Sequence, residues 1–145
     1  MKPVASGVVA FIKELARHYD LGIVSMAEYS EIDHVLNLAG ISHQFSLVVS
    51  AATDLRHKPA PDCYLRGLDL LNSRRRADRK LPLLAAECVV IEDAPPGIEA
   101  ARAAGMRTIG VTTTVGEKAL RDAGADIVTG NLADWNADAV HHLFG

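Results

Sequence analysis

Aromatic side chains are scarce in this sequence, at 5% of the residues. The chain of 145 residues is nevertheless 49% hydrophobic, so aliphatic side chains must fill its core. A chain of this length suits one domain with a sizeable core. The charged fraction of 23% is that of an ordinary soluble globular protein. We therefore expect residues 1–145 to form a single domain.

Several other features are absent, and each absence excludes a class of protein. The two cysteines, Cys63 and Cys88, lack the close spacing of metal ligands, which favours a reduced, cytoplasmic setting. No apolar run approaches the roughly 18 residues that span a bilayer, and the N-terminus lacks the pattern of a signal peptide. The net charge of −3 argues against a nucleic-acid binder. We expect neither a membrane nor a nucleic-acid partner.

Short apolar runs alternate with segments of helical periodicity. This pattern predicts strands at 21–25, 45–50, 87–93, 107–113 and 125–130, and helices at 8–17, 31–40, 61–72, 95–106, 116–123 and 137–144. Such alternation is typical of an α/β domain with parallel strands. The apolar runs are continuous, as expected for strands that are covered on both faces.

Local residue choices predict how some of these helices begin, end and pack. Ser30 is expected to cap the helix at 31–40, with Asp33 at the capping-box position and Gly40 as the stop. A proline at the first turn suits the helix at 95–106. In the helix at 61–72 the inward-facing residues are expected to be Leu65, Leu68 and Leu71.

The carboxyl ends of the strands are the expected ligand side of a parallel sheet. The residues at these ends are Ser25, the loop after Ser50, the pair Glu92 and Asp93, and threonines 112–114. The Ser25 hydroxyl could donate to a phosphate oxygen beside backbone N–H groups. The alternative is a capping or turn serine.

Lys58 lies in "HKPAPD", where two prolines limit the freedom of the backbone. This suits a cation aimed at one place, such as a phosphoryl group, and the alternative is a surface lysine in a loop. His57 is interpreted as a loop histidine rather than a base. Cys63 is interpreted as a packing residue rather than a nucleophile.

Glu92 and Asp93 end an apolar strand and carry the oxygen ligands that Mg²⁺ prefers. Two adjacent residues cannot complete such a site alone. The alternative is that Asp93 caps the next helix while Glu92 is solvated.

One stretch interrupts the α/β pattern. "SRRRADRKLP" (73–82) is rich in cations: Arg74, Arg75, Arg76, Arg79 and Lys80. It could recognise an anionic patch on a partner, or it could be a solvated helix end and loop.

Together, these elements resemble a known superfamily. A strand ending in serine, then Lys-Pro-x-Pro-Asp, then a strand ending in Glu-Asp resemble the second, third and fourth motifs of the haloacid dehalogenase superfamily. The matching stretches are "LGIVSMA", "HKPAPDCY" and "VVIEDAPPGIEAARAAGM". The resemblance is closest to the β-phosphoglucomutase-like and phosphoglycolate-phosphatase-like branch, and it runs from about Pro3 to about Asp126.

The resemblance implies a Rossmann-like three-layer fold and Mg²⁺-dependent phosphoryl transfer on a small phosphorylated metabolite. Ser25 would bind the transferring phosphoryl group. Lys58 would neutralise the charge of the nucleophile and the phosphoryl group. Asp93, with Glu92, would hold Mg²⁺. Two departures are Met26, where the family often has Asn, and Ala94, where it often has Ser.

The family's first motif, Asp-x-Asp, is missing from the sequence. In the family, its first Asp is the nucleophile that forms an aspartyl-phosphate, and its second is the general acid/base. No two of the eleven aspartates here are separated by one residue. The helical cap domain that sets substrate choice is missing as well. The resemblance therefore implies a core that starts after the first strand and the cap.

The missing strand would lie between the strand ending at Ser25 and the strand ending at Asp93. Because an unfilled gap would leave unsatisfied strand edges in a core, we expect those two strands to pair directly. Otherwise a partner chain or a second copy would supply a strand.

We expect the C-terminal part of a phosphatase or phosphomutase-like hydrolase, inactive by itself because covalent catalysis needs a nucleophile. The alternative is a non-catalytic remnant or a split-enzyme subunit that binds phosphate, Mg²⁺ or a partner chain. An unrelated doubly wound domain, such as a receiver, is disfavoured by the Lys-Pro-x-Pro stretch.

Overall fold

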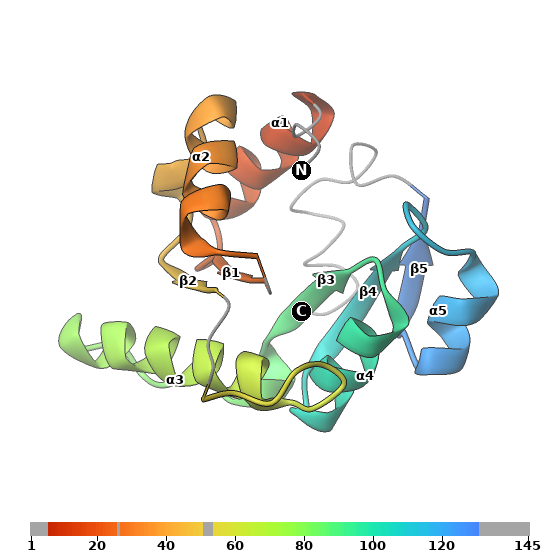
Figure 1. Cartoon of the computed structure of the whole chain (residues 1–145). Helices are drawn as coiled ribbons and strands as arrows, with labels where there is room; N and C mark the ends of the chain where they lie inside the picture. Colours follow the sequence, from red (N-terminus) through yellow and green to blue (C-terminus); the bar gives the residue numbers. More distant parts are fainter. Residues whose placement is uncertain (1–5, 26, 51–53, 131–145) are drawn as a thin grey trace. The chain divides into compact units, whose positions relative to one another are not determined.

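The computed structural model describes residues 6–25, 27–50 and 54–130, which form two compact units (Figure 1). The described residues up to 50 make the first unit, and residues 54–130 make the second. The predicted helix at 137–144 lies outside the described residues. The single-domain organisation of residues 1–145 stays a prediction.

The first unit packs helices against a two-stranded sheet (Figure 1). Its elements in order are α1 (Ser6–Ala16), β1 (Gly22–Val24), α2 (Tyr29–Ala39), the 3₁₀ turn η1 (Ser42–Gln44) and β2 (Leu47–Val49). Strands β1 and β2 are parallel, with Gly22 opposite Leu47. The centre of the core consists of Ile32, Leu36 and Ile41.

Helix α2 ends as predicted but begins earlier. Gly40 adopts a left-handed conformation, with φ of 70°, and its N–H meets the carbonyls of Asn37 and Leu36. The N-cap is Glu28, not Ser30, and no side chain caps this end. The carbonyl of Glu28 already accepts the N–H of Glu31 at 3.0 Å, which places Ser30 inside the first turn. The predicted capping box is therefore wrong.

The second unit carries a three-stranded parallel sheet in the order β3–β4–β5. Its elements in order are α3 (Asp62–Ala77), the 3₁₀ turn η2 (Ala85–Glu87), β3 (Val89–Glu92), α4 (Pro95–Ala103), β4 (Arg107–Val111), α5 (Glu117–Ala123) and β5 (Ile127–Thr129). Helices α4 and α5 contact each other and the sheet. Ile98, Ile109 and Leu120 are fully buried in this unit. The predicted α/β class with parallel strands is confirmed.

Helix α3 differs from its prediction in length and in the face that it buries. It continues to Ala77, so the first part of the basic stretch is helical. Its buried residues are Cys63, Tyr64 and Gly67. Leu65 is 42% exposed, so the prediction that it faces inward is wrong. Leu68 and Leu71 are half-buried, so the predicted inward face is correct in part, and Tyr64 rather than Leu65 is buried in the first turn.

Within each unit, the hydrogen-bonded neighbour of β1 is β2, and that of β3 is β4. Strand β3 therefore lies at the edge of its sheet. The predicted pairing of the strand ending at Ser25 with the strand ending at Asp93 would join the two units, and it stays a prediction. A strand supplied by a partner chain stays a prediction. None of the helices in the described ranges is long and apolar enough to cross a membrane.

Candidate functional site

The carboxyl end of β3 gathers several polar side chains of the second unit. Glu92 is the last residue of the strand, and Asp93 follows it directly. Glu92 lies beside Gly110 of β4 in the parallel register. The chain leaves β4 into threonines 112–114, so these hydroxyls reach the same edge as the two acids. This is the edge at which parallel sheets bind ligands.

A single oxygen of Glu92 accepts two hydrogen bonds from distant parts of the sequence. Lys58 Nζ donates to Glu92 Oε2 at 2.9 Å, and the Tyr64 hydroxyl donates to the same oxygen at 2.8 Å. Lys58 Nζ also lies 5.1 Å from the centroid of the Tyr64 ring, within range of a cation–π interaction. We call these three side chains the Lys58–Glu92–Tyr64 cluster.

This cluster is largely shielded from water. The side chains of Lys58 and Glu92 are 16% and 13% exposed. The alternative of an ordinary surface lysine at position 58 is therefore wrong. Burial, followed by the neighbouring charge of Glu92, raises the pKa of Tyr64 well above its usual value. Tyr64 therefore remains a protonated donor to the carboxylate.

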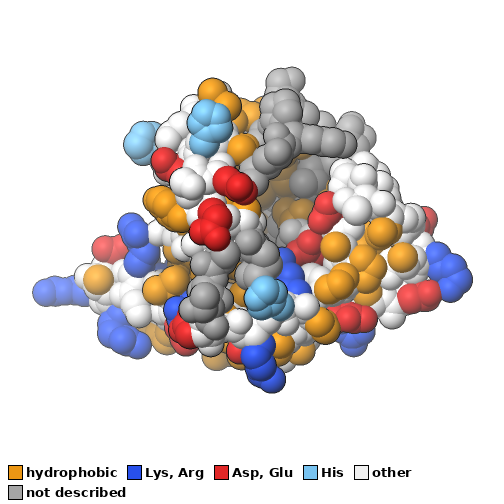
Figure 2. Space-filling model, viewed as in Figure 1, with side chains coloured by type: hydrophobic (Ala, Val, Ile, Leu, Met, Phe, Trp, Pro, Cys, Tyr) orange, Lys and Arg blue, Asp and Glu red, His pale blue; other side chains and the backbone are white. Residues whose placement is uncertain are grey.

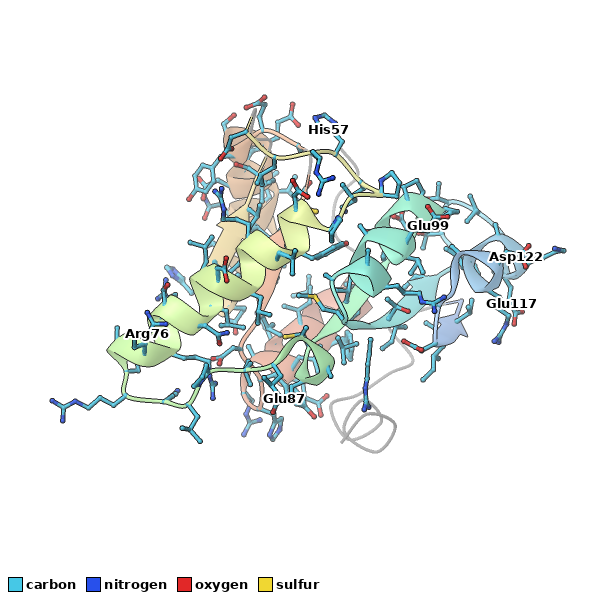
Figure 3. The ribbon with its side chains drawn as sticks, turned by 90° about the horizontal axis from the view of Figure 1, so that it is seen from below. His57, Arg76, Glu87, Glu99, Glu117 and Asp122 are labelled. Carbon is cyan, nitrogen blue, oxygen red and sulfur yellow. The ribbon has the colours of Figure 1, made fainter. Side chains whose placement is uncertain are left out.

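The loop that carries Lys58 is fastened to the start of α3. The Arg56 guanidinium donates to the Asp62 carboxylate at 2.8 Å, and the Arg56 backbone N–H donates to it at 3.1 Å. His57 is exposed on this loop (Figure 3), which confirms its interpretation as a loop histidine. Cys63 is fully buried, and burial raises the pKa of its thiol. The packing interpretation of Cys63 is likewise confirmed.

Gly97, in the first turn of α4, makes room for the Glu92 side chain. A Cβ atom at position 97 would overlap the Glu92 carboxylate. The glycine of the Glu-Asp-x-x-x-Gly motif is thus a steric requirement of the cluster.

Asp93 is held by hydroxyl groups from the loop after β4. Thr114 Oγ1 donates to Asp93 Oδ2 at 2.6 Å, and Thr113 Oγ1 lies 3.4 Å from the same oxygen. The Thr114 hydrogen bond is the main cause that lowers the pKa of Asp93, and partial burial opposes it. Asp93 is therefore ionised at neutral pH. Its Oδ1 accepts no hydrogen bond from a residue that the structure describes.

The capping alternative for this pair is wrong. The N-cap of α4 is Ala94, and no side chain caps that helix. Glu92 is not solvated, because it is paired with Lys58 and Tyr64.

The donor set of this site suits a cation that takes few protein ligands. In residues 6–25, 27–50 and 54–130, no three His, Cys, Asp or Glu side chains gather into a metal-binding group. Mg²⁺ is typically held by one or two carboxylates, with water and phosphate oxygens completing its shell. Asp93 Oδ1 fits such a single ligand. The prediction that Glu92 is a second ligand remains a prediction, since Lys58 and Tyr64 use one of its oxygens.

An open hollow of about 620 Å³ lies at the carboxyl ends of β4 and β5. It is lined by residues 112–117 and 128–130. Because Thr113 and Thr114 line the hollow and also contact Asp93, a small polar ligand could lie beside that carboxylate.

Residues 2–111 match the family model of haloacid dehalogenase-like hydrolases. The chain belongs to this family. The match includes Ser25, Lys58, Glu92 and Asp93.

Two known proteins are similar to this chain over most of its length. The Arabidopsis thaliana protein SUPPRESSOR OF QUENCHING 1, chloroplastic, is 36% identical over 79% of this chain and 10% of that protein. Fructose-1-phosphate phosphatase YqaB of Escherichia coli is 32% identical over 72% of this chain and 50% of that protein. The chain thus spans half or less of these two relatives.

The family fold is also found among solved structures. The crystal structure of a beta-phosphoglucomutase, described as putative, from Thermotoga maritima superposes with a TM-score of 0.78 at 23% identity. The superposition covers 96% of this chain and 60% of that chain. It confirms the Rossmann-like fold that the family motifs implied.

Ser25 lies in the first unit, directly after β1. Its backbone N–H donates to the carbonyl of Val49 at 2.9 Å, and its Oγ accepts the N–H of Ala27 at 3.1 Å. The hydroxyl therefore shapes the turn, as the alternative interpretation expected, while its own proton is not used in that bond. The phosphate-binding role of Ser25 stays a prediction.

Sequence reasoning did not select Tyr64 or Gly97 as site residues. Tyr64 lies six residues after Lys58 in a motif of this family, which is the signal that could have found it. Gly97 could be recognised only once the position of the Glu92 side chain was known.

Proposed function

We propose that this chain carries the phosphoryl-binding side of a Mg²⁺-dependent phosphatase or phosphomutase site. Lys58 and Ser25 would bind the phosphoryl group, and Asp93, with Glu92 beside it, would hold the metal. The observation that supports this most is the anchoring of Lys58 by Glu92, next to the ionised Asp93. Such placement suits phosphoryl transfer, in which positioning and charge neutralisation do most of the work.

The charges of the site favour joint binding of a cation and a phosphate. Lys58 and Glu92 compensate each other, and Asp93 leaves a formal charge of −1 for the three side chains. A phosphate alone would meet this negative charge at short range. When bound at Asp93, Mg²⁺ would supply positive charge that neutralises phosphate oxygens. Lys58 would then orient the phosphoryl group, with its ammonium held in place by Glu92.

The proposed ligand is a small phosphorylated metabolite. This class rests on the family, which includes a fructose-1-phosphate phosphatase among the relatives. The open hollow beside Thr113 and Thr114 is polar and of a size that accepts such a molecule.

A second candidate is binding without turnover, alone or as one part of a split enzyme. It is favoured by the lack of an Asp-x-Asp pair anywhere in the sequence. In a split enzyme, a partner chain or a second copy would add a strand to the free edge of β3. In the described residues this edge lacks a strand, and Ile91 on β3 is 38% exposed.

The test is a titration of the protein with inorganic phosphate, in the presence and in the absence of Mg²⁺. Binding is monitored by NMR. We expect the Nζ signal of Lys58 and the amide signal of Asp93 to shift with phosphate, and to shift at lower phosphate concentration when Mg²⁺ is present. Asp93→Asn should abolish the Mg²⁺ effect, and Lys58→Met should abolish phosphate binding.

Matched controls come from an exposed ion pair in α5. Lys118 and Asp122 are linked at 2.7 Å and lie 88% and 65% exposed. Lys118→Met and Asp122→Asn repeat the same chemical changes away from the site, and they should leave both responses intact. The proposal fails if Lys58 and Asp93 show no response to either ligand, or if these controls remove it as well.

A further inference from the structure

The last residues of α3 and the connection that follows the helix take no part in the proposed function. We define the basic tip as residues 74–84, which include the end of α3. Residues 74–80 contain five cations and one acid, a local formal charge of +4, although the whole chain carries −3. Figure 2 shows Lys and Arg side chains gathered at the end of α3. Positive charge is thus concentrated at one end of the second unit.

The backbone of the basic tip is held in a defined conformation. The Asn72 side chain accepts the N–H of Leu83 at 2.8 Å and donates to the carbonyl of Leu83 at 3.0 Å. Arg75 Nε donates to the carbonyl of Leu81 at 2.7 Å, and the N–H of Lys80 donates to the carbonyl of Arg75 at 2.8 Å. The backbone of the basic tip is therefore ordered, and its exposed side chains start from fixed positions.

Most cations of the tip are available to an external anion. Arg75 is engaged within the protein. Within the part of the chain that the structure describes, four exposed side chains make no ion pair or side-chain hydrogen bond: Arg74, Arg76, Arg79 and Lys80. Figure 3 places Arg76 at the outer end of α3. Exposed guanidinium groups without an ion-pair partner in the described residues suit partners that carry phosphate groups.

Two strongly exposed leucines follow these cations in the sequence. Leu81 is 82% exposed and Leu84 is 69% exposed. Segments that combine cations with exposed large apolar side chains are typical of proteins that lie on a charged surface with an apolar layer beneath it. The partner must therefore offer negative charge and an apolar layer that the leucines can enter.

We propose that the basic tip docks onto an anionic phospholipid surface. Arg74, Arg76, Arg79 and Lys80 would lie near headgroup phosphates, and Leu81 and Leu84 would enter the boundary between headgroups and acyl chains. The sequence predicted no membrane partner because it lacks a spanning segment, and surface docking requires none.

The experiment is co-sedimentation of the full chain with vesicles. One set contains phosphatidylcholine alone, and the other contains phosphatidylcholine with phosphatidylglycerol. We expect binding to the anionic vesicles only, and a bound fraction that falls as salt is added, because salt screens the attraction. The double variant Arg76→Glu/Arg79→Glu should weaken binding by at least about tenfold. Leu81→Ser/Leu84→Ser should also weaken it, and the remaining binding should depend more steeply on salt.

The chain offers matched controls for both changes. Lys13→Glu/Arg17→Glu alters the net charge equally on exposed residues of the first unit. Leu38→Ser removes another strongly exposed leucine, 75% exposed, from α2. Both controls should bind anionic vesicles like the unchanged protein.

Three outcomes would overturn the proposal. Equal binding to both kinds of vesicle would exclude a role for the headgroup charge. Equal losses in the controls would show that the tip is not the docking surface. Retention on immobilised polyglutamate, with no binding to anionic vesicles, would assign the tip to an acidic polypeptide instead.

Discussion

The Tyr64 hydroxyl lies 2.8 Å from Glu92 Oε2, the oxygen that Lys58 approaches to 2.9 Å. Tyr64 and Glu92 are 28 residues apart in the sequence, so this contact fixes α3 to the end of β3. It also orients the carboxylate that anchors Lys58. Tyr64 would not contact a phosphoryl group itself. Through Glu92, however, it controls the position of Lys58, the cation that would bind that group.

Removing this hydroxyl should destabilise the second unit. We expect Tyr64→Phe to lower the free energy of unfolding by about 1–2 kcal/mol, because a shielded carboxylate loses a donor. Urea denaturation followed by circular dichroism measures the change. Tyr29→Phe removes a hydroxyl from a tyrosine that is 58% exposed, and its effect should stay within about 0.5 kcal/mol. Equal effects of the two substitutions would contradict a special role for the Tyr64 hydroxyl.

Gly97→Ala should be destabilising although alanine favours helices. Alanine in a helix interior gains about 1 kcal/mol over glycine, but its Cβ would overlap the Glu92 carboxylate. We expect a net loss of about 1–3 kcal/mol from this overpacking, measured by the same denaturation experiment. Gly116→Ala is the control, since a Cβ there meets no atom within 4 Å. A neutral or stabilising Gly97→Ala would show that Glu92 moves aside at little cost.

The Asp93 carboxylate should make stability depend on acid pH. Its pKa in the folded protein lies below the ordinary value of 3.8, chiefly because Thr114 donates to it. The unfolded chain therefore binds the proton more tightly, and the stabilisation is present above pH 3.8 and lost as pH falls through the lower folded pKa. Thr114→Val should raise the pKa of Asp93, as followed by carboxyl ¹³C NMR, and should reduce this acid sensitivity. An unchanged Asp93 pKa in Thr114→Val would show that the hydroxyl does not stabilise the charged form.

This chain, assayed alone, should not hydrolyse a generic phosphatase substrate such as p-nitrophenyl phosphate in the presence of Mg²⁺. The family's nucleophile belongs to an Asp-x-Asp pair, which this sequence lacks, and covalent catalysis requires a nucleophile. The rate of release of p-nitrophenol measures this directly. Hydrolysis well above background that disappears in Asp93→Ala would contradict the expectation and would require another nucleophile.

The sequence predicted the elements of the second unit well, because their apolar runs are continuous and the residues that end these runs are typical of turns. The strand that ends at Glu92 and the proline at the first turn of α4 appear as expected. On α3, leucine periodicity predicted the half-buried Leu68 and Leu71, but it did not predict the buried Tyr64, whose hydroxyl donates to the distant Glu92. Ser30 was chosen as a cap from its residue type, but the backbone hydrogen bonds of Glu28 decide where α2 begins.

The candidate site was predicted through its motif residues, but their contacts were not. Nothing in the sequence shows that Lys58 and Tyr64 share one oxygen of Glu92, because the three residues come from three separate elements. The same holds for Thr114 and Asp93, which are 21 residues apart. Side-chain contacts of this kind depend on strand register, which the sequence pattern does not specify.

The arrangement around Lys58 also limits the direction from which an anion can approach. An ammonium group has three N–H donors, and one of them points to Glu92. The Tyr64 ring lies 5.1 Å from Nζ and covers another side. At most two donors therefore remain for a ligand. The site would therefore select a ligand by the geometry of its approach as much as by its charge.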